Sequence, residues 1–311
     1  PNRFRSTPIS RRPGACTAWC ILALLVVAAS PTAADDDLRE IFAARGFNAS
    51  AIVLPDAGSA FPKPALEKIA FEKVANFDPY PEGPSYRPSD GSYFFSGNVA
   101  LTRVDPEGKL HRVLGKPGGG GTHFLPDSSV LIVGSSGLRR VFPDGRIALL
   151  ADGKEVGGGN DLTVGKYGEI YFSAPKRGIY RLTPGEDGKL ELVSEKGTNG
   201  LDVDPTGAWL YVVGGGVHRY PIHGRDKPLG KREMVSPLPK GQGGGDGCAF
   251  DVWGHFYTMH FGTGMIRVVD PEKRTVIGTI PVGVVPASNL TFGGARNTEL
   301  FVTAGAPKHN N

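Results

Sequence analysis

Four side chains that carry oxygen atoms recur at similar places in this sequence: Glu82, Asn160, Asn199 and Asp246. Each stands at the start of an apolar stretch, and a turn glycine follows each of the last three after eight residues. Two carboxylates and two amides, without His or Cys, suit a hard cation, Ca²⁺ first and Mg²⁺ or Mn²⁺ next. Such an ion would polarise a substrate carbonyl or acidify a water molecule. Ordinary turns are the alternative interpretation, because Asn-Gly and Asp-Gly are common turn dipeptides.

The spacing of these residues indicates a repeat. Similar starts occur at 82, 160, 199, 246 and 288, and Gly121 fills the wider gap between the first two. Strands that alternate with Gly, Asp and Pro turns at a period of about 40 residues are typical of propeller blades. We therefore predict an all-β fold, a six-bladed β-propeller over residues 69–311. A β-sandwich is the alternative, but it would not produce a repeated start motif.

A propeller would bring the candidate residues together. The first residues of its innermost strands all face one end of the central channel, so six starts converge on one point. Composition agrees with many short strands and turns, since the 311 residues include 45 Gly and 26 Pro, which weaken helices. An apolar content of 40% argues against general disorder, and three Cys exclude a disulfide scaffold.

The N-terminal residues 1–34 have the pattern of a secretory signal peptide. Four arginines precede an apolar run, and small residues follow it up to Ala34. This segment holds four of the 35 basic residues and none of the 31 acidic ones, so the remainder balances at 31 each. A neutral mature chain argues against nucleic acid as a partner. We expect an exported protein, periplasmic or secreted, with no membrane contact after signal removal.

Residues 35–68 contain Pro55, Pro62 and Pro64 and are predicted to be a linker. The last blade is short, because only seven residues follow Ala304. Residues 68–74, just before the first blade, are predicted to supply a strand that completes it. Such closure removes open sheet edges.

The ordered motifs resemble the senescence marker protein/regucalcin/gluconolactonase family of six-bladed propellers. The resemblance covers about residues 69–304 and is greatest to the bacterial gluconolactonases. Its motifs are Glu82-Gly83-Pro84, Asn160-Asp161-Leu162, Asn199-Gly200-Leu201, Asp246-Gly247 and the segment from Asn289 to Gly294. The chain departs from the family at Gly158, where animal members have a substrate-contacting Arg, and at Gly121, which lacks a polar side chain.

The resemblance implies hydrolysis of a sugar lactone to an aldonic acid. One divalent metal, Ca²⁺ before Mg²⁺, Mn²⁺ or Zn²⁺, would be held by Glu82, Asn160, Asn199 and Asp246. Asp246 would also be the general base for the attacking water. Weaker candidates for contact with the substrate, a small lactone, are His260, His123 and Asn289. We expect the protein to be a monomer. Two rival functions stay open: another ester or organophosphate hydrolase on the same site, and a non-catalytic binding propeller with a structural metal.

Overall fold

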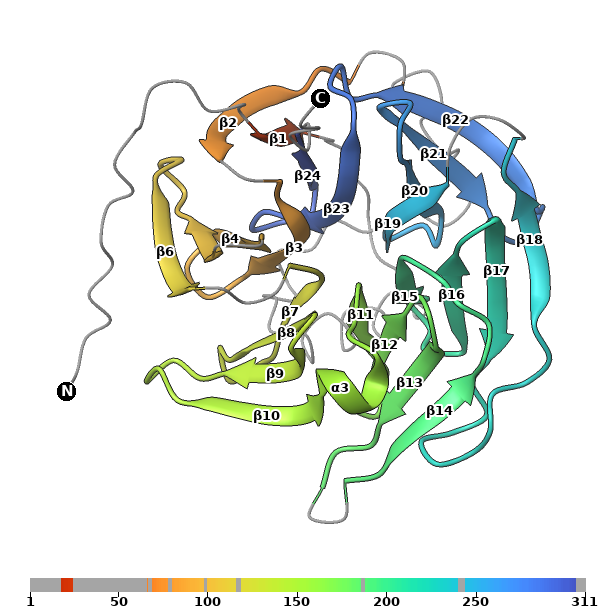
Figure 1. Cartoon of the computed structure of the whole chain (residues 1–311). Helices are drawn as coiled ribbons and strands as arrows, with labels where there is room; N and C mark the ends of the chain where they lie inside the picture. Colours follow the sequence, from red (N-terminus) through yellow and green to blue (C-terminus); the bar gives the residue numbers. More distant parts are fainter. Residues whose placement is uncertain are drawn as a thin grey trace, which may run out of the picture.

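Strands radiate around a common centre in the computed structural model, and this arrangement is an all-β propeller (Figure 1). The structure describes residues 18–24, 66, 69–77, 80–97, 100–115, 119–185, 188–239 and 244–305, with the backbone alone at 18–24 and 77. The predicted all-β propeller class is confirmed. Helix α3 (Gly153–Val156) is short. Within the described ranges, no helix has the length and apolar character needed to cross a membrane.

Five four-stranded sheets are each built from strands that follow one another along the chain. The first contains β3 (Glu82–Arg87), β4 (Ser92–Ser96), β5 (Ala100–Val104) and β6 (Leu110–Gly115). The second contains β7 (Thr122–Phe124), β8 (Val130–Gly134), β9 (Gly137–Val141) and β10 (Ile147–Asp152). The third contains β11 (Leu162–Val164), β12 (Ile170–Ala174), β13 (Gly178–Leu182) and β14 (Leu190–Ser194).

The two remaining sheets of this kind follow the same order. One contains β15 (Leu201–Val203), β16 (Trp209–Val213), β17 (Gly216–Pro221) and β18 (Glu233–Pro237). The other contains β19 (Gly245–Phe250), β20 (Phe256–His260), β21 (Met265–Asp270) and β22 (Thr275–Pro281). In all five sheets the strands pair antiparallel with their neighbours in the chain, so short turns suffice to connect them.

A further four-stranded sheet combines both ends of the chain in the order β2-β1-β24-β23. Its strands are β1 (Ala18–Leu24), β2 (Glu72–Phe77), β23 (Ala287–Gly293) and β24 (Glu299–Ala304). The predicted closing segment, residues 68–74, overlaps β2. However, β1 lies between β2 and β24 and pairs antiparallel with both, so the closing segment is the outermost strand of this composite sheet.

Strand β1 falls within the predicted signal peptide, residues 1–34. Its pairing satisfies backbone groups that an open edge of β24 would leave without partners. The removal of residues 1–34 on export stays a prediction. The predicted linker, residues 35–68, lies outside the described residues except for Leu66, which is buried against Ile280 and its neighbours.

The core lies between neighbouring sheets. Every residue of the second strands β4, β8, β12 and β20 is buried. Successive side chains of a strand point to opposite faces, so burial on both faces requires a sheet on each side. Strand β12 shows this: Phe172 packs with Leu131 on one side, whereas Tyr171 packs with Leu201 on the other.

The turns between first and second strands use the glycines that mark the sequence repeat. Gly168 and Gly207 have φ values of 81° and 72°, in the region that only glycine adopts without strain. The offset of eight residues therefore reflects the distance from the start of the innermost strand to the glycine turn that follows it. This repeat brings the strand starts to equivalent places in each sheet.

Candidate metal and catalytic site

The starts of the innermost strands touch one another around the centre of the propeller. Hydrogen bonds join three neighbouring pairs: Gly121 N to Asn160 O (2.6 Å), Gly200 N to Asp246 O (3.2 Å), and Ser288 Oγ to Pro81 O (2.9 Å). Gly83 and Gly121 pack so closely that a Cβ on Gly83 would lie 2.2 Å from the Cα of Gly121. We call this set of starts, residues 82–83, 121, 160, 199–200, 246–247 and 288–289, the strand-start ring.

Two carboxylates of the ring interact. Burial raises the pKa of Asp246 to about 8, the charge of Asp161 adds to the rise, and a hydrogen bond from Asn199 lowers it. The pKa of Glu82 is also raised well above its ordinary value, by burial first and then by the charges of Asp246 and Asp161. Asp246 is only 5% exposed. Adjacent buried carboxylates of this kind repel each other when ionised, and a cation between them would relieve the repulsion.

The amide of Asn199 completes a donor set. Its NH₂ group donates to the Asp246 carboxylate, which orients the side chain. Its Oδ1 atom is buried and has no hydrogen-bond partner among the described residues. A buried acceptor without a donor is costly, and a metal ion would satisfy it. The structure therefore brings Glu82, Asn199 and Asp246 together, in a set that fits a hard cation.

Asn160 belongs to the same ring through its backbone. Its carbonyl accepts from Gly121 N, and its N–H donates to Ser173 O at 2.8 Å. Within the described ranges, no group of three or more His, Cys, Asp or Glu side chains is arranged to hold a metal. A cation at the ring would thus depend on amide oxygens in addition to the two carboxylates.

Tyr80 is a member of this site that the sequence did not reveal. Its hydroxyl donates to Glu82 and lies against the hydroxyl of Ser288. Burial raises its pKa, and the charges of Glu82 and Asp246 raise it further, so the hydroxyl stays neutral and can donate. Its position two residues before Glu82 was the signal available in the sequence, but no repeat of Tyr at the other starts marks it.

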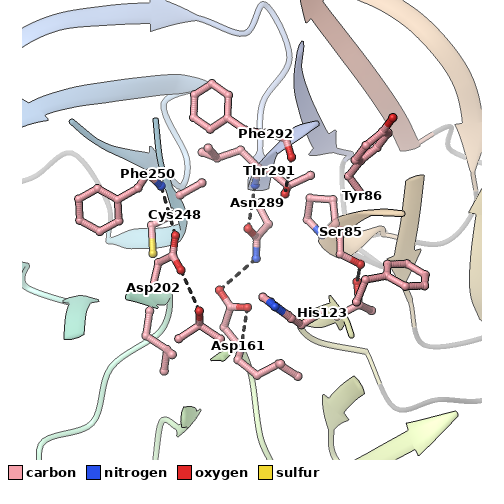
Figure 2. A pocket seen from close by; sticks show the side chains of 18 of the residues that line it. Ser85, Tyr86, His123, Asp161, Asp202, Cys248, Phe250, Asn289, Thr291 and Phe292 are labelled. Atoms are coloured by element: carbon pink, nitrogen blue, oxygen red, sulfur yellow. Dashed lines mark hydrogen bonds between the residues drawn. The ribbon is translucent and has the colours of Figure 1, made fainter. Parts of the chain in front are cut away.

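A pocket lies further along the innermost strands, with a volume of about 120 Å³ (Figure 2). His123 and Asn289, two of the predicted substrate contacts, line it. None of the four predicted metal ligands lines the pocket, and His260 does not line it either. His260 is 1% exposed and lies on β20, opposite Gly245 of β19. The sequence-predicted residues thus divide between the ring, the pocket and the second strand of one sheet.

Asp161 links the ring to the pocket. Its Oδ1 accepts from Leu162 N at 2.9 Å, and its Oδ2 accepts from Asn289 Nδ2 at 3.3 Å, across the channel (Figure 2). The side chain is 6% exposed, and burial raises its pKa to about 7. Asp161 thus accepts from the backbone of the next residue and contacts a strand 128 residues further along the chain.

Asp202 ties together three innermost strands at the pocket wall. It accepts from Thr163 Oγ1 at 2.8 Å and from Phe250 N at 3.2 Å (Figure 2). Cys248 on β19 is 7% exposed, and burial raises its thiol pKa, so it stays protonated.

Known proteins resemble this chain. Residues 80–306 match the family model described as SMP-30/Gluconolactonase/LRE-like region. A segment of 111 residues is 29% identical to the 6-deoxy-6-sulfogluconolactonase of Pseudomonas putida, covering 34% of this chain and 38% of that enzyme. A segment of 75 residues is 29% identical to a protein of Sulfolobus acidocaldarius, covering 24% and 27% of the two chains. The matches thus span well under half of these curated relatives.

Two solved structures have the same fold. A gluconolactonase from Xanthomonas campestris has a TM-score of 0.66 at 22% identity, covering 79% of this chain and 94% of that one. A calcium-binding protein, regucalcin, from Agrobacterium tumefaciens has a TM-score of 0.66 at 22% identity, with coverage of 75% and 84%. At these identities the likeness establishes the fold.

Proposed function

Because the chain belongs to the SMP-30/gluconolactonase/LRE-like family, as the resemblance in its sequence predicted, we propose that it is an enzyme that hydrolyses a sugar lactone to the aldonic acid. We propose further that it uses one divalent cation, Ca²⁺ before Mg²⁺, Mn²⁺ or Zn²⁺. The lactonase match in Pseudomonas putida supports the substrate class.

One observation carries the proposal. The buried side-chain oxygen of Asn199 has no hydrogen-bond partner among the described residues. The NH₂ group of the same side chain donates to the Asp246 carboxylate, and the ionised Asp246 repels Glu82. A purely structural channel would pair these groups with each other or with donors. Glu82, Asn199 and Asp246, together with Asn160 at the neighbouring start, would hold the cation. When bound, it would supply positive charge that stabilises the oxyanion formed from the lactone carbonyl.

The protein's own groups have separate tasks in this mechanism. Asp246 accepts the proton of the attacking water, and burial makes its carboxylate a stronger base than an exposed aspartate. The amide of Asn199 holds that carboxylate in position. Tyr80 donates to Glu82 and keeps it turned toward the ring. His123, Asn289 and His260 stay proposed contacts for sugar hydroxyls.

We also propose that the composite sheet β2-β1-β24-β23 is the sixth blade of the propeller. Strands from both chain ends would then close the circle of blades. The protein is proposed to act as an exported monomer with residues 1–34 removed, and in that form β1 is absent and the sixth blade is made of β2, β24 and β23. The mass of the protein recovered from outside the cytoplasm tests this: a mature chain that begins near residue 35 is expected, and one that retains residues 18–24 contradicts the removal.

The function is tested with purified protein depleted of metal by a chelator. Glucono-1,5-lactone and lactones of other ring sizes are supplied, and acid release is followed with a pH indicator. We expect hydrolysis of a sugar lactone to disappear on chelation and to return with added Ca²⁺. Full activity after chelation would overturn the metal requirement, and no hydrolysis of any lactone with Ca²⁺ present would overturn the function.

A further inference from the structure

Strand β10 forms the outer edge of the second sheet, at the rim of the propeller (Figure 1). Among the strands that the structure describes, β9 is the one that pairs with it. Phe142 N donates to Arg146 O at 2.9 Å where this pairing begins, and bonded and non-bonded pairs alternate along an antiparallel ladder. The backbone groups of Ala148 therefore face β9, whereas those of Ile147 and Leu149 face the outer edge.

The same two residues carry exposed aliphatic side chains. Ile147 is 46% exposed and Leu149 is 57% exposed, and both lie on one face of the strand because they are two positions apart. Edge strands are commonly protected from pairing by a charged residue or a proline, and residues 147–151 contain neither. The bulge between Leu149 and Ala151 ends the regular stretch. Its first half thus has the backbone and the side chains needed to pair with another strand.

The charged residues at the two ends of β10 make the strand complementary to a reversed copy of itself. Before the strand, Arg146 is the nearer charge and Asp144 the further one; at the other end, Asp152 is the nearer and Lys154 the further. Two antiparallel copies therefore bring Arg146 of one toward Asp152 of the other, and Asp144 toward Lys154. A two-fold axis repeats both contacts, as in an isologous interface.

The internal contacts of these residues leave capacity for such pairs. Arg146 Nε donates to Asp144 Oδ2 at 2.7 Å, and a guanidinium has further N–H groups for a second carboxylate. The Arg146 side chain is 71% exposed. Asp152 Oδ1 accepts from Lys154 N at 2.8 Å as the N-cap of α3, and a carboxylate has two acceptor oxygens.

We propose that β10 is a contact between two copies of this chain, paired antiparallel across a two-fold axis. The backbone groups of Ile147 in one copy would bond those of Leu149 in the other, and the two side chains would pack beside each other. An unrelated extended peptide fits the observations less well, because the self-complementary order of charges is used only when the partner is a second copy.

The contact leaves the strand-start ring unchanged. No residue of the ring belongs to β10, and β10 lies at the opposite edge of the second sheet from its innermost strand β7. Each copy would carry its own complete site, so the monomer stays the unit that hydrolyses the lactone, and two such monomers associate as their concentration rises. The inference is independent of the proposed lactone hydrolysis.

Sedimentation equilibrium of the purified protein tests the contact between about 1 μM and about 1 mM, a range that covers weak association. The native protein is expected to change from monomer to dimer. Leu149→Lys is expected to weaken association at least about tenfold, because it places two charges in the paired edge. Leu192→Lys is the matched control, since Leu192 is 44% exposed on the outermost strand β14 of the third sheet, and its association is expected to equal that of the native protein. A native protein that stays monomeric, or equal association of the two variants, would overturn the proposal.

Charge reversal tests the two-fold pairing itself. Arg146→Glu and Asp152→Lys each bring like charges together, so each variant alone is expected to associate about tenfold more weakly. In a mixed pair the new glutamate faces the new lysine and the native Arg146 faces the native Asp152, so an equal mixture is expected to recover association. Circular dichroism checks that both proteins are folded, since Asp152→Lys also removes the N-cap of α3. A mixture of folded variants that associates no better than either alone would overturn the proposal. Lactone hydrolysis per chain is expected to be equal in all these proteins.

Discussion

Asp246 combines two properties that oppose each other in a metal-free protein. It is nearly inaccessible to solvent, yet its neighbours Glu82 and Asp161 are acidic, so its ionised form is disfavoured. Asn199 and Tyr80 each donate one hydrogen bond to the carboxylate pair, which orients the groups without neutralising their charge. This is the electrostatic setting of a cation site, in which the ion supplies the missing positive charge.

We predict that Asp246→Asn lowers lactone hydrolysis by about 10²–10⁴-fold, the usual contribution of a general base. The substitution keeps the shape and the acceptor oxygen but removes the basic group. Initial rates measure the effect, and circular dichroism checks the fold. The control is Asp226→Asn at an exposed position, which is expected to leave the rate unchanged. A natively folded Asp246→Asn protein with full activity would contradict the assigned role.

Calcium binding is expected to depend on pH. The pKa of Asp246 is raised from 3.8 to about 8, so below pH 8 calcium must displace a proton, and affinity should rise with pH and level off above about 8. The same shift predicts that stability of the metal-free protein falls as pH rises from about 4 to 8, since only the unfolded state ionises easily there. Calorimetry in buffers of different ionisation enthalpy measures the released protons; equal affinity at pH 6 and pH 8.5 would count against the site.

At the scale of elements, the ring depends on the close approach of β3 and β7. Gly83 has a φ of 47°, and a Cβ there would meet the backbone of Gly120 and Gly121 at less than 3 Å. Thr122 adds a hydrogen bond of 2.6 Å from its Oγ1 to the carbonyl of Gly83. Neighbouring innermost strands are therefore held in register by contacts that admit no side chain at this point.

Gly83→Ala is expected to destabilise the protein by about 2–4 kcal/mol, because backbone strain at positive φ adds to a clash that needs strand movement. Gly254→Ala is the matched control: its φ of 79° carries the same strain, but nothing lies within 4 Å of the added Cβ. Urea denaturation measures both. If the two substitutions cost the same free energy of unfolding, the close packing of β3 against β7 is not what stabilises the ring.

At the scale of the whole molecule, the composite sheet joins the chain ends and packs against the first sheet. Phe301 of β24 is fully buried and stacks on Tyr93 of β4 with 4.3 Å between ring centres. The Tyr93 hydroxyl donates to Glu299 at 3.0 Å. These contacts connect residues more than 200 positions apart and close the circle of sheets (Figure 1).

Phe301→Ala is expected to lower the free energy of unfolding by about 3–5 kcal/mol, the usual cost of truncating a buried phenylalanine. Phe261→Ala is the control, since that side chain is 37% exposed and contributes little to the core. Thermal unfolding monitored by near-ultraviolet circular dichroism compares the two. A similar small effect of both would show that the composite sheet does not close the molecule in solution.

The repeat itself could be recognised in the sequence. Strand starts and turn glycines at constant offset predicted the propeller and placed Glu82, Asn160, Asn199 and Asp246 in one ring, because side-chain period and turn chemistry are local properties. The resemblance of those motifs to a known family was confirmed by the match over residues 80–306.

Contacts between side chains of different sheets form only when the sheets are arranged around the centre. They could therefore not be predicted from local patterns in the sequence. The bond between Asn289 and Asp161 crosses 128 positions, Tyr80 joins Glu82 to Ser288, and Arg87, Arg103 and Arg112 gather at a boundary between sheets. Even the strand next to β24 comes from an apolar run that the sequence indicated as a signal peptide. The repeating unit and the oxygen-bearing residues at its start follow from local patterns in the sequence. Which of those residues contact one another depends on the folded molecule, because the point at which they meet exists only once the sheets surround it.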